Sequence, residues 1–130
     1  MNTALVCGPK GSPVYAISLP GKNNSETDSP SLRWDSKSTP FVTSDVPTPL
    51  FYRDRFYILS DVKKNLSCVD PRSGDLVWQI ILPGKYKWRS SPTAGDGKVF
   101  LMNHNAKVLV VNAHDGTVLN EVQMLSLIHI

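Results

Sequence analysis

Residues able to carry out acid–base or metal chemistry are few and scattered in this chain of 130 residues. The three histidines are His104, His114 and His129, and none stands at a metal-ligand spacing from Cys, Asp or Glu. His104 and His114 fall in sequences typical of turns, where a histidine is normally solvated. No nucleophile turn accompanies a Ser-His-Asp order, and no glycine-rich phosphate loop precedes a helix. The sequence therefore predicts no catalytic residue and no metal or cofactor ligand.

The acidic and aromatic residues give one cluster of interest. Asp61, Asp70 and Asp75 are too dispersed for a calcium loop. The segment Tyr86-Lys87-Trp88-Arg89 combines aromatic and basic side chains. It could contact a ligand or a protein partner, but we favour a linker that packs its aromatic stems against the fold.

The charge and the cysteine content exclude few classes of function. The net charge is +3, yet the basic residues are spread along the chain, so we predict no nucleic-acid binding, which needs a clustered basic face. Cys7 and Cys68 each lie in an apolar run, which favours buried thiols over a disulfide. No apolar stretch approaches the roughly 18 residues of a membrane helix. The first residues lack the features of a signal peptide, and a signal upstream of the chain stays open.

The chain repeats itself with a period of 42 to 43 residues. Phe56–Leu59 reappears as Val99–Met102, and Leu66–Asp70 reappears as Val108–Asn112. An earlier, degraded copy contains Val14–Ile17 and Leu32–Trp34, with a longer polar loop at Pro20–Pro30 that we interpret as a surface excursion. The units run over residues 3–37, 47–82 and 90–124.

Each unit has the pattern of four short antiparallel strands. In the central unit we expect strands at Pro49–Tyr52, Phe56–Ser60, Asn65–Val69 and Asp75–Leu82. Phe56–Leu59 and Val108–Val111 are continuously apolar, so we expect both faces of these strands to be covered. Repeated four-stranded units covered on both faces are what a β-propeller requires. A β-sandwich is the competing all-β architecture, but it would not explain the repeat of whole units. We therefore predict an all-β fold, a partial β-propeller of about two and a half to three blades.

The segment Cys68–Trp78 resembles the signature of the pyrroloquinoline-quinone (PQQ)-type propeller repeat. That family has Ala-x-Asp, a turn with Thr-Gly, and a Trp four residues after the Gly. Here Cys68 stands for the Ala and Ser73 for the Thr. Ser90–Phe100 is similar to the entry of the next blade, and the resemblance covers residues 4–124.

The motif residues have structural roles that their chemistry explains. Gly74 suits a turn with positive φ, Asp70 can accept hydrogen bonds from turn amides, and Trp78 can pack on the adjacent blade. The last unit departs from the pattern, with Asn112 for the Asp and Asn120 for the Trp, which leaves its docking to a further blade open. The residues we expect to be structural rather than ligand-binding are Asp70, Gly74, Trp78, Trp34, Asn112 and Gly116.

The resemblance implies three functions. The first is a non-catalytic scaffold that binds a protein partner, similar to the propeller lipoproteins of the outer-membrane β-barrel assembly machinery, with a periplasmic or cell-envelope location. The second is a fragment of a quinoprotein alcohol dehydrogenase, which would use PQQ and calcium. Against it, the chain lacks the adjacent cysteine pair typical of many such enzymes, and no calcium ligand can be matched. The third is a sensory propeller attached to a kinase or another domain.

The final segment Leu125–Ile130 resembles a translated sequencing adapter, so we interpret it as a non-native tail. The alternative interpretation is an ordinary apolar β-strand. If it is an adapter, the natural protein continues past Met124 and the remaining blades are missing. Apolar blade faces and strand edges would then lack partners, and we expect the isolated chain to aggregate or fold poorly.

Overall fold

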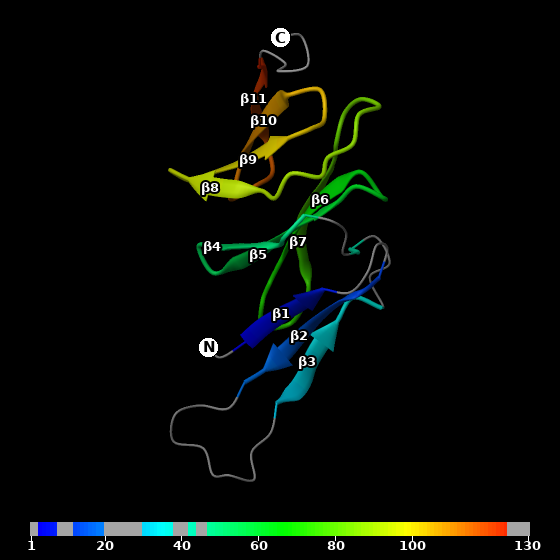
Figure 1. The fold of residues 1–130 in the computed structure, drawn as a ribbon. Helices are drawn as coiled ribbons and strands as arrows, with labels where there is room; N and C mark the ends of the chain where they lie inside the picture. The colour runs from blue at the N-terminus through cyan, green and yellow to red at the C-terminus, as the bar shows by residue number, and fades with distance from the viewer. Residues whose placement is uncertain (1–2, 8–11, 20–29, 38–41, 44–46, 125–130) are drawn as a thin grey trace.

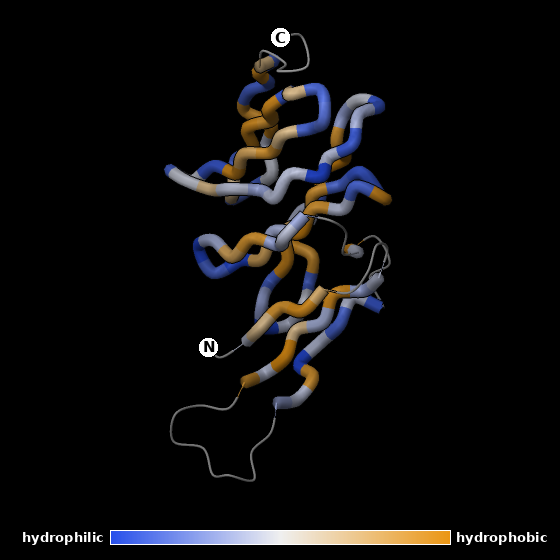
Figure 2. Tube along the Cα trace, in the orientation of Figure 1, coloured by the Kyte–Doolittle hydropathy of each residue, from blue (hydrophilic) through white to orange (hydrophobic). Residues whose placement is uncertain are grey.

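The computed structural model describes residues 3–7, 12–19, 30–37, 42–43 and 47–124. These residues form eleven β-strands and no helix, arranged as three antiparallel sheets that follow one another along the molecule (Figure 1). In the described part of the chain, nothing is both helical and long and apolar enough to cross a membrane. Figure 2 shows hydrophobic residues concentrated in the strands and hydrophilic residues at many of the turns. The predicted all-β fold of stacked antiparallel units is confirmed.

The sheets are named here by their order in the chain. The first sheet has the order β1-β2-β3 and contains β1 (Thr3–Cys7), β2 (Val14–Ser18) and β3 (Ser31–Asp35). The middle sheet has the order β4-β5-β6-β7 and contains β4 (Leu50–Tyr52), β5 (Arg55–Ser60), β6 (Asn65–Val69) and β7 (Leu76–Ile81). The last sheet has the order β11-β10-β9-β8 and contains β8 (Thr93–Gly95), β9 (Lys98–Met102), β10 (Lys107–Asn112) and β11 (Val118–Gln123).

The three sheets share an irregularity at one position. The register shifts directly after Cys68, which pairs with Trp78, and again directly after Val110, which pairs with Asn120. In the first sheet the shift follows Ala16, whose partner is Trp34. A β-bulge changes the direction of a strand locally, so its recurrence shows that the units are built to one plan.

The short hairpins between the first two strands of the middle and last sheets have the same backbone form. Arg53 and Asp54 have φ values of 50° and 61°, while Asp96 and Gly97 have 53° and 74°. Two consecutive residues with positive φ are the mark of a hairpin turn whose twist matches that of its strands. Asp tolerates this conformation through its short polar side chain, and Gly has no Cβ to oppose it.

The hydrophobic core lies between the sheets. One cluster, between the middle and last sheets, includes Tyr57, Leu59, Leu66, Cys68, Val99, Leu101, Leu109 and Val111. A second cluster, on the other face of the middle sheet, includes Val14, Val42, Phe56, Ile58 and Val69. Both faces of the middle sheet are therefore covered, and the expectation for Phe56–Leu59 is confirmed.

For Val108–Val111 the same expectation is wrong. Leu109 and Val111 are buried against the middle sheet, but Val108 and Val110 are only partly buried. Their neighbours on that face, Phe100 on β9 and Met102, are 36% and 40% exposed. The reason is that no further sheet among the described residues packs on this face.

Two sequence-based expectations cannot be placed in the structure. The loop Pro20–Pro30 lies outside the described residues apart from Pro30, and so does the tail Leu125–Ile130. Both stay predictions. The two cysteines are free, with Cys68 buried and Cys7 partly buried, so the interpretation as separate thiols is confirmed.

Candidate functional site

Trp34 and Gly74 form the junction between the first and middle sheets. Gly74 has a φ of 77°, and a Cβ added to it would stand 2.6 Å from the Trp34 ring. The Trp34 Nε1 donates a 2.6 Å hydrogen bond to the carbonyl of Pro71. Glycine is thus required at position 74 for two reasons. The backbone has a positive φ, and the indole lies where a Cβ would stand.

Trp78 and Gly116 repeat this junction between the middle and last sheets. A Cβ on Gly116 (φ 80°) would stand 2.7 Å from the Trp78 ring, and Trp78 Nε1 donates to the Ala113 carbonyl at 3.2 Å. Each Trp therefore packs on the turn of the sheet that follows it. Asn120, at the corresponding position of the last sheet, is exposed.

Asp70 and Asn112 hold the same turn in successive sheets. The amide of Arg72 donates to Asp70 Oδ1 at 2.9 Å, and the amide of His114 donates to Asn112 Oδ1 at 2.8 Å. A side-chain oxygen that accepts from the amide two residues on is a common way to stabilise a turn. The change from Asp to Asn therefore keeps the turn and removes one negative charge.

The segment Tyr86–Arg89 connects the middle and last sheets. Trp88 is fully buried in the core, and its backbone amide donates to Asp61 Oδ1 at 2.9 Å. Arg89 Nε lies 3.3 Å from Asp61 Oδ2. Burial alone would raise the pKa of Asp61, but the Trp88 amide and the Arg89 guanidinium outweigh it and lower that pKa below its usual value. Sequence reasoning considered Asp61 only as part of a calcium loop and did not foresee these contacts, because nothing local distinguishes it from other turn aspartates.

The same connection presents an exposed surface beside the turn at residues 61–64. Lys64 Nζ donates to the carbonyls of Lys85 and Tyr86 at 3.2 and 3.3 Å, which ties the turn to the connecting segment. Three apolar side chains, one each on this turn, at the end of β7 and in the connecting segment, are exposed, namely Val62 (47%), Ile81 (74%) and Tyr86 (41%). Exposed lysines accompany them. We call this the linker surface, which comprises Val62, Lys63, Ile81, Lys85, Tyr86 and Lys87.

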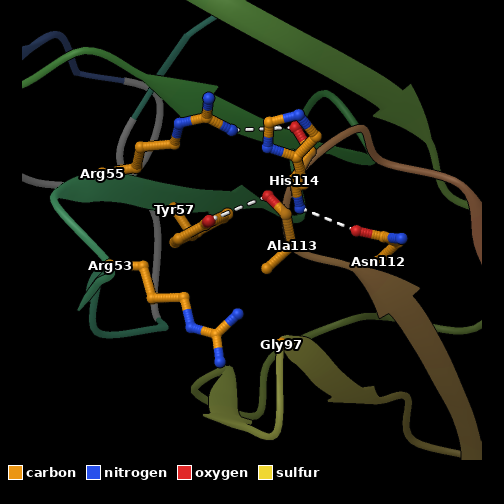
Figure 3. A pocket seen from close by; sticks show the side chains of 7 residues that line it. All are labelled: Arg53, Arg55, Tyr57, Gly97, Asn112, Ala113 and His114. Atoms are coloured by element: carbon orange, nitrogen blue, oxygen red, sulfur yellow. Dashed lines mark hydrogen bonds between the residues drawn. The ribbon is translucent and has the colours of Figure 1, made fainter.

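A pocket of about 200 Å³ lies at the other end of the strands, between the middle and last sheets. Figure 3 shows its lining residues, Arg53, Arg55, Tyr57, Gly97, Asn112, Ala113 and His114. Arg55 Nη1 donates to the His114 carbonyl at 2.8 Å, and the Tyr57 hydroxyl donates to the Ala113 carbonyl at 2.9 Å. The pocket is therefore framed by hydrogen bonds between the two sheets.

Two titratable groups at this junction stay neutral at physiological pH. Burial raises the pKa of the Tyr57 phenol to about 12, and burial raises the pKa of the Cys68 thiol to about 11. A neutral phenol can donate its proton to the Ala113 carbonyl, and a thiol with so high a pKa is a poor nucleophile. These groups therefore serve packing and hydrogen bonding rather than reaction.

The histidines do not gather into a site. His104 and His114 are both exposed in turns. Within the described ranges, no group of three or more His, Cys, Asp or Glu side chains is placed to hold a metal ion.

The stacking described above is shared with solved structures. The chain is similar to a europium-containing methanol dehydrogenase, with a TM-score of 0.72 and 13% identity over 97% of this chain. It is also similar to BamB from Moraxella catarrhalis, with a TM-score of 0.71 and 14% identity over 97% of this chain. The fold is that of a β-propeller segment. Its three sheets are therefore called blades from here on. The quinohemoprotein alcohol dehydrogenase ADHIIG from Pseudomonas putida HK5 matches likewise, with a TM-score of 0.73 and 15% identity over 96% of this chain.

The chain corresponds to a minority of each of these proteins. It spans 24% of the methanol dehydrogenase, 36% of BamB and 19% of the alcohol dehydrogenase. No protein-family model matches the chain, and no curated protein sequence matches it. The similarity is thus one of fold, carried at low sequence identity by the repeated blade plan.

Proposed function

We propose that this chain is part of a non-catalytic β-propeller that serves as a protein-binding platform. The observation that carries the proposal is the linker surface. Exposed apolar and aromatic side chains gathered in one place and flanked by charged ones are typical of protein-binding surfaces. Here Val62, Ile81 and Tyr86 supply the apolar part, and lysines flank them.

The linker surface is also held in a fixed shape. Trp88 anchors the connecting segment in the core, and Asp61 binds both Trp88 and Arg89. A loop fixed in this way loses little conformational entropy when a partner binds it. The lysines favour a partner whose contacting face is acidic.

The proposed platform needs further blades. The face of the last blade that carries Phe100 and Met102 corresponds to the face of the middle blade that carries Tyr57 and Leu59. In the middle blade those residues are 1% exposed because the last blade covers them. An equivalent apolar face at the end of the chain suits the docking of another blade.

Photo-crosslinking in the source cells tests the partner surface. A photoreactive phenylalanine analogue at position 86 of the full-length protein is expected to crosslink to a partner protein. The matched control places the analogue at Thr117, which is exposed in a turn at the opposite end of the strands. Crosslinks that are equal at both positions, or absent from position 86, would contradict the proposal.

A quinoprotein dehydrogenase is the second candidate, because two of the similar structures are methanol and alcohol dehydrogenases. The described residues supply no metal-binding cluster, so the ligands would have to come from outside the described part of the chain, including the other blades. Adding pyrroloquinoline quinone and calcium to the full-length protein, followed by a dye-linked alcohol oxidation assay, separates the two candidates. Turnover of an alcohol would overturn the scaffold proposal.

A further inference from the structure

We propose that the pocket between the middle and last blades binds an oxyanion, a carboxylate or phosphate group, through Arg53 and Arg55. Both arginines extend from the middle blade toward the turns of the last blade (Figure 3). The guanidinium group presents several N–H donors in a plane, which suits the two oxygens of a carboxylate or phosphate.

Arg53 makes no close ion pair among the described residues; the pKa of the exposed Asp96 is lowered mainly by Lys98, and the charge of Arg53 contributes less. Its guanidinium carbon lies 5.2 Å from the centre of the Tyr52 ring. Its Nη1 lies 3.1 Å from the point where a Cβ on Gly97 would stand. The cation is therefore held over a ring and against a glycine, and its donors are left for a ligand.

Arg55 also keeps donors for a ligand. Its one hydrogen bond to the last blade runs from Nη1 to the His114 carbonyl. Arg55 also interacts with the side chains of Tyr57 and Cys68. A guanidinium has five N–H donors, so these contacts together do not use all of them. Asn112 accepts the His114 amide with Oδ1, which leaves its amide nitrogen as a further donor on the pocket wall.

Comparison of the two blades shows that two positions with a carboxylate in the middle blade carry neutral residues at this pocket. Gly97 and Asn112 occupy the positions that Asp54 and Asp70 occupy in the middle blade. Asp54 and Asp70 both line a cavity at the equivalent turns of the middle blade. The last blade thus has neutral residues at the two places where a carboxylate would neutralise the arginines.

The remaining nearby acids are otherwise engaged. Asp96 is fully exposed and pairs with Lys98 at 3.1 Å. Asp115 is exposed and accepts the Thr117 amide at 2.9 Å. No carboxylate lines the pocket in the part of the chain that the structure describes. Its volume of about 200 Å³ exceeds the roughly 30 Å³ share of one water molecule, so there is room for an oxyanion.

This inference does not depend on the proposed function, because the pocket and the linker surface lie at opposite ends of the strands. The test is an NMR titration of the ¹⁵N-labelled full-length protein with sodium phosphate, with sodium acetate, and with sodium chloride at equal ionic strength. We expect saturable shifts of the Gly97, Ala113 and His114 amides with phosphate or acetate, and none with chloride. Shifts with phosphate alone would identify a phosphate group, and shifts with both would include carboxylates.

Two variants test the roles of Asn112 and Arg53, and a third variant serves as a control. Asn112→Asp restores the carboxylate that Asp70 supplies in the middle blade, where the same turn forms, so it is expected to fold. Arg53→Asn removes the cation, and Asn tolerates the positive φ of this position. Each is expected to weaken binding by about tenfold or more, because one unit of charge changes beside the ligand. Arg33→Gln, an equal charge change at an exposed position of β3, should leave the affinity within about twofold.

Amide shifts that are the same in all three salts would overturn the proposal. So would equal affinity in the Asn112→Asp variant and the unchanged chain, with a dispersed spectrum showing that both are folded.

Discussion

The middle and last blades have the same strand order and the same bulge, yet they differ sharply in burial. All five residues of β6 are buried, whereas β10 alternates between buried and partly buried residues over its last four positions. On the outer strands, β7 is half-buried in its centre and β11 is exposed throughout. Among the described residues, the middle blade packs on a blade at each side and the last blade packs on one, and this explains the difference in burial. Blade sequence therefore specifies a unit that needs two neighbours.

The largest expected effect comes from truncating the equivalent apolar residue in each of the two blades. Leu59 and Met102 are equivalent in the repeat, but Leu59 is 1% exposed and Met102 is 40% exposed. We expect Leu59→Ala to lower the free energy of unfolding by about 2–5 kcal/mol through lost contacts and a cavity. Met102→Ala should cost less than about 1 kcal/mol. Urea unfolding measures both, and equal losses would remove the distinction between the blades.

The next effect tests the packing of Trp on the turn of the following blade. Gly74→Ala places a methyl group against the Trp34 ring at a positive φ, while Gly84→Ala has a similar φ of 82° and no atom within 4 Å. We expect Gly84→Ala to lower the free energy of unfolding by about 1–2 kcal/mol from backbone strain alone. Gly74→Ala should lose a further 1–3 kcal/mol or so from overpacking. Equal losses in thermal or urea unfolding would show that the indole moves away at little cost.

A smaller effect is expected at the connection between the two blades. The pKa of Asp61 is lowered in the folded state, so its ionised form contributes stability above the ordinary value of 3.8, and this contribution is lost as the pH falls through the folded pKa. Asp61→Asn should cost about 1 kcal/mol at pH 7. The variant should also lose less stability than the parent chain between pH 5 and about 2. Unfolding curves at several pH values measure this, and parallel curves for the two proteins would contradict it.

The smallest effect is expected where the last blade departs from the motif. Asn120 is exposed at the position of Trp78, and no following turn packs on it among the described residues. Asn120→Trp should therefore change the free energy of unfolding by less than about 0.5 kcal/mol. A clear stabilisation would mean that the indole finds a surface within this chain, and the asymmetry between the blades would then need another explanation.

Much of the fold could be predicted from the sequence because the repeat of 42 to 43 residues shows where each unit and its strands lie. The strand Asn65–Val69 was predicted to the residue, and β5 differs only in beginning at Arg55. Gly, Asp and Trp at regular spacing mark turns and packing surfaces through local chemistry. Burial of Val108 and Val110 was wrongly predicted, because an apolar strand looks the same whether or not a neighbour covers it.

The sequence by itself determined the unit, its strands and the chemistry of its turns, since these depend on contacts between residues close along the chain. Only the tertiary structure decided that Trp78 lies on Gly116, that Asp61 holds Trp88, and that Arg53 and Arg55 line a pocket without a carboxylate among its lining residues. Each of these contacts joins residues from 27 to about 60 positions apart. Such contacts depend on how the blades stack, and the spacing of residues within one blade does not contain that information.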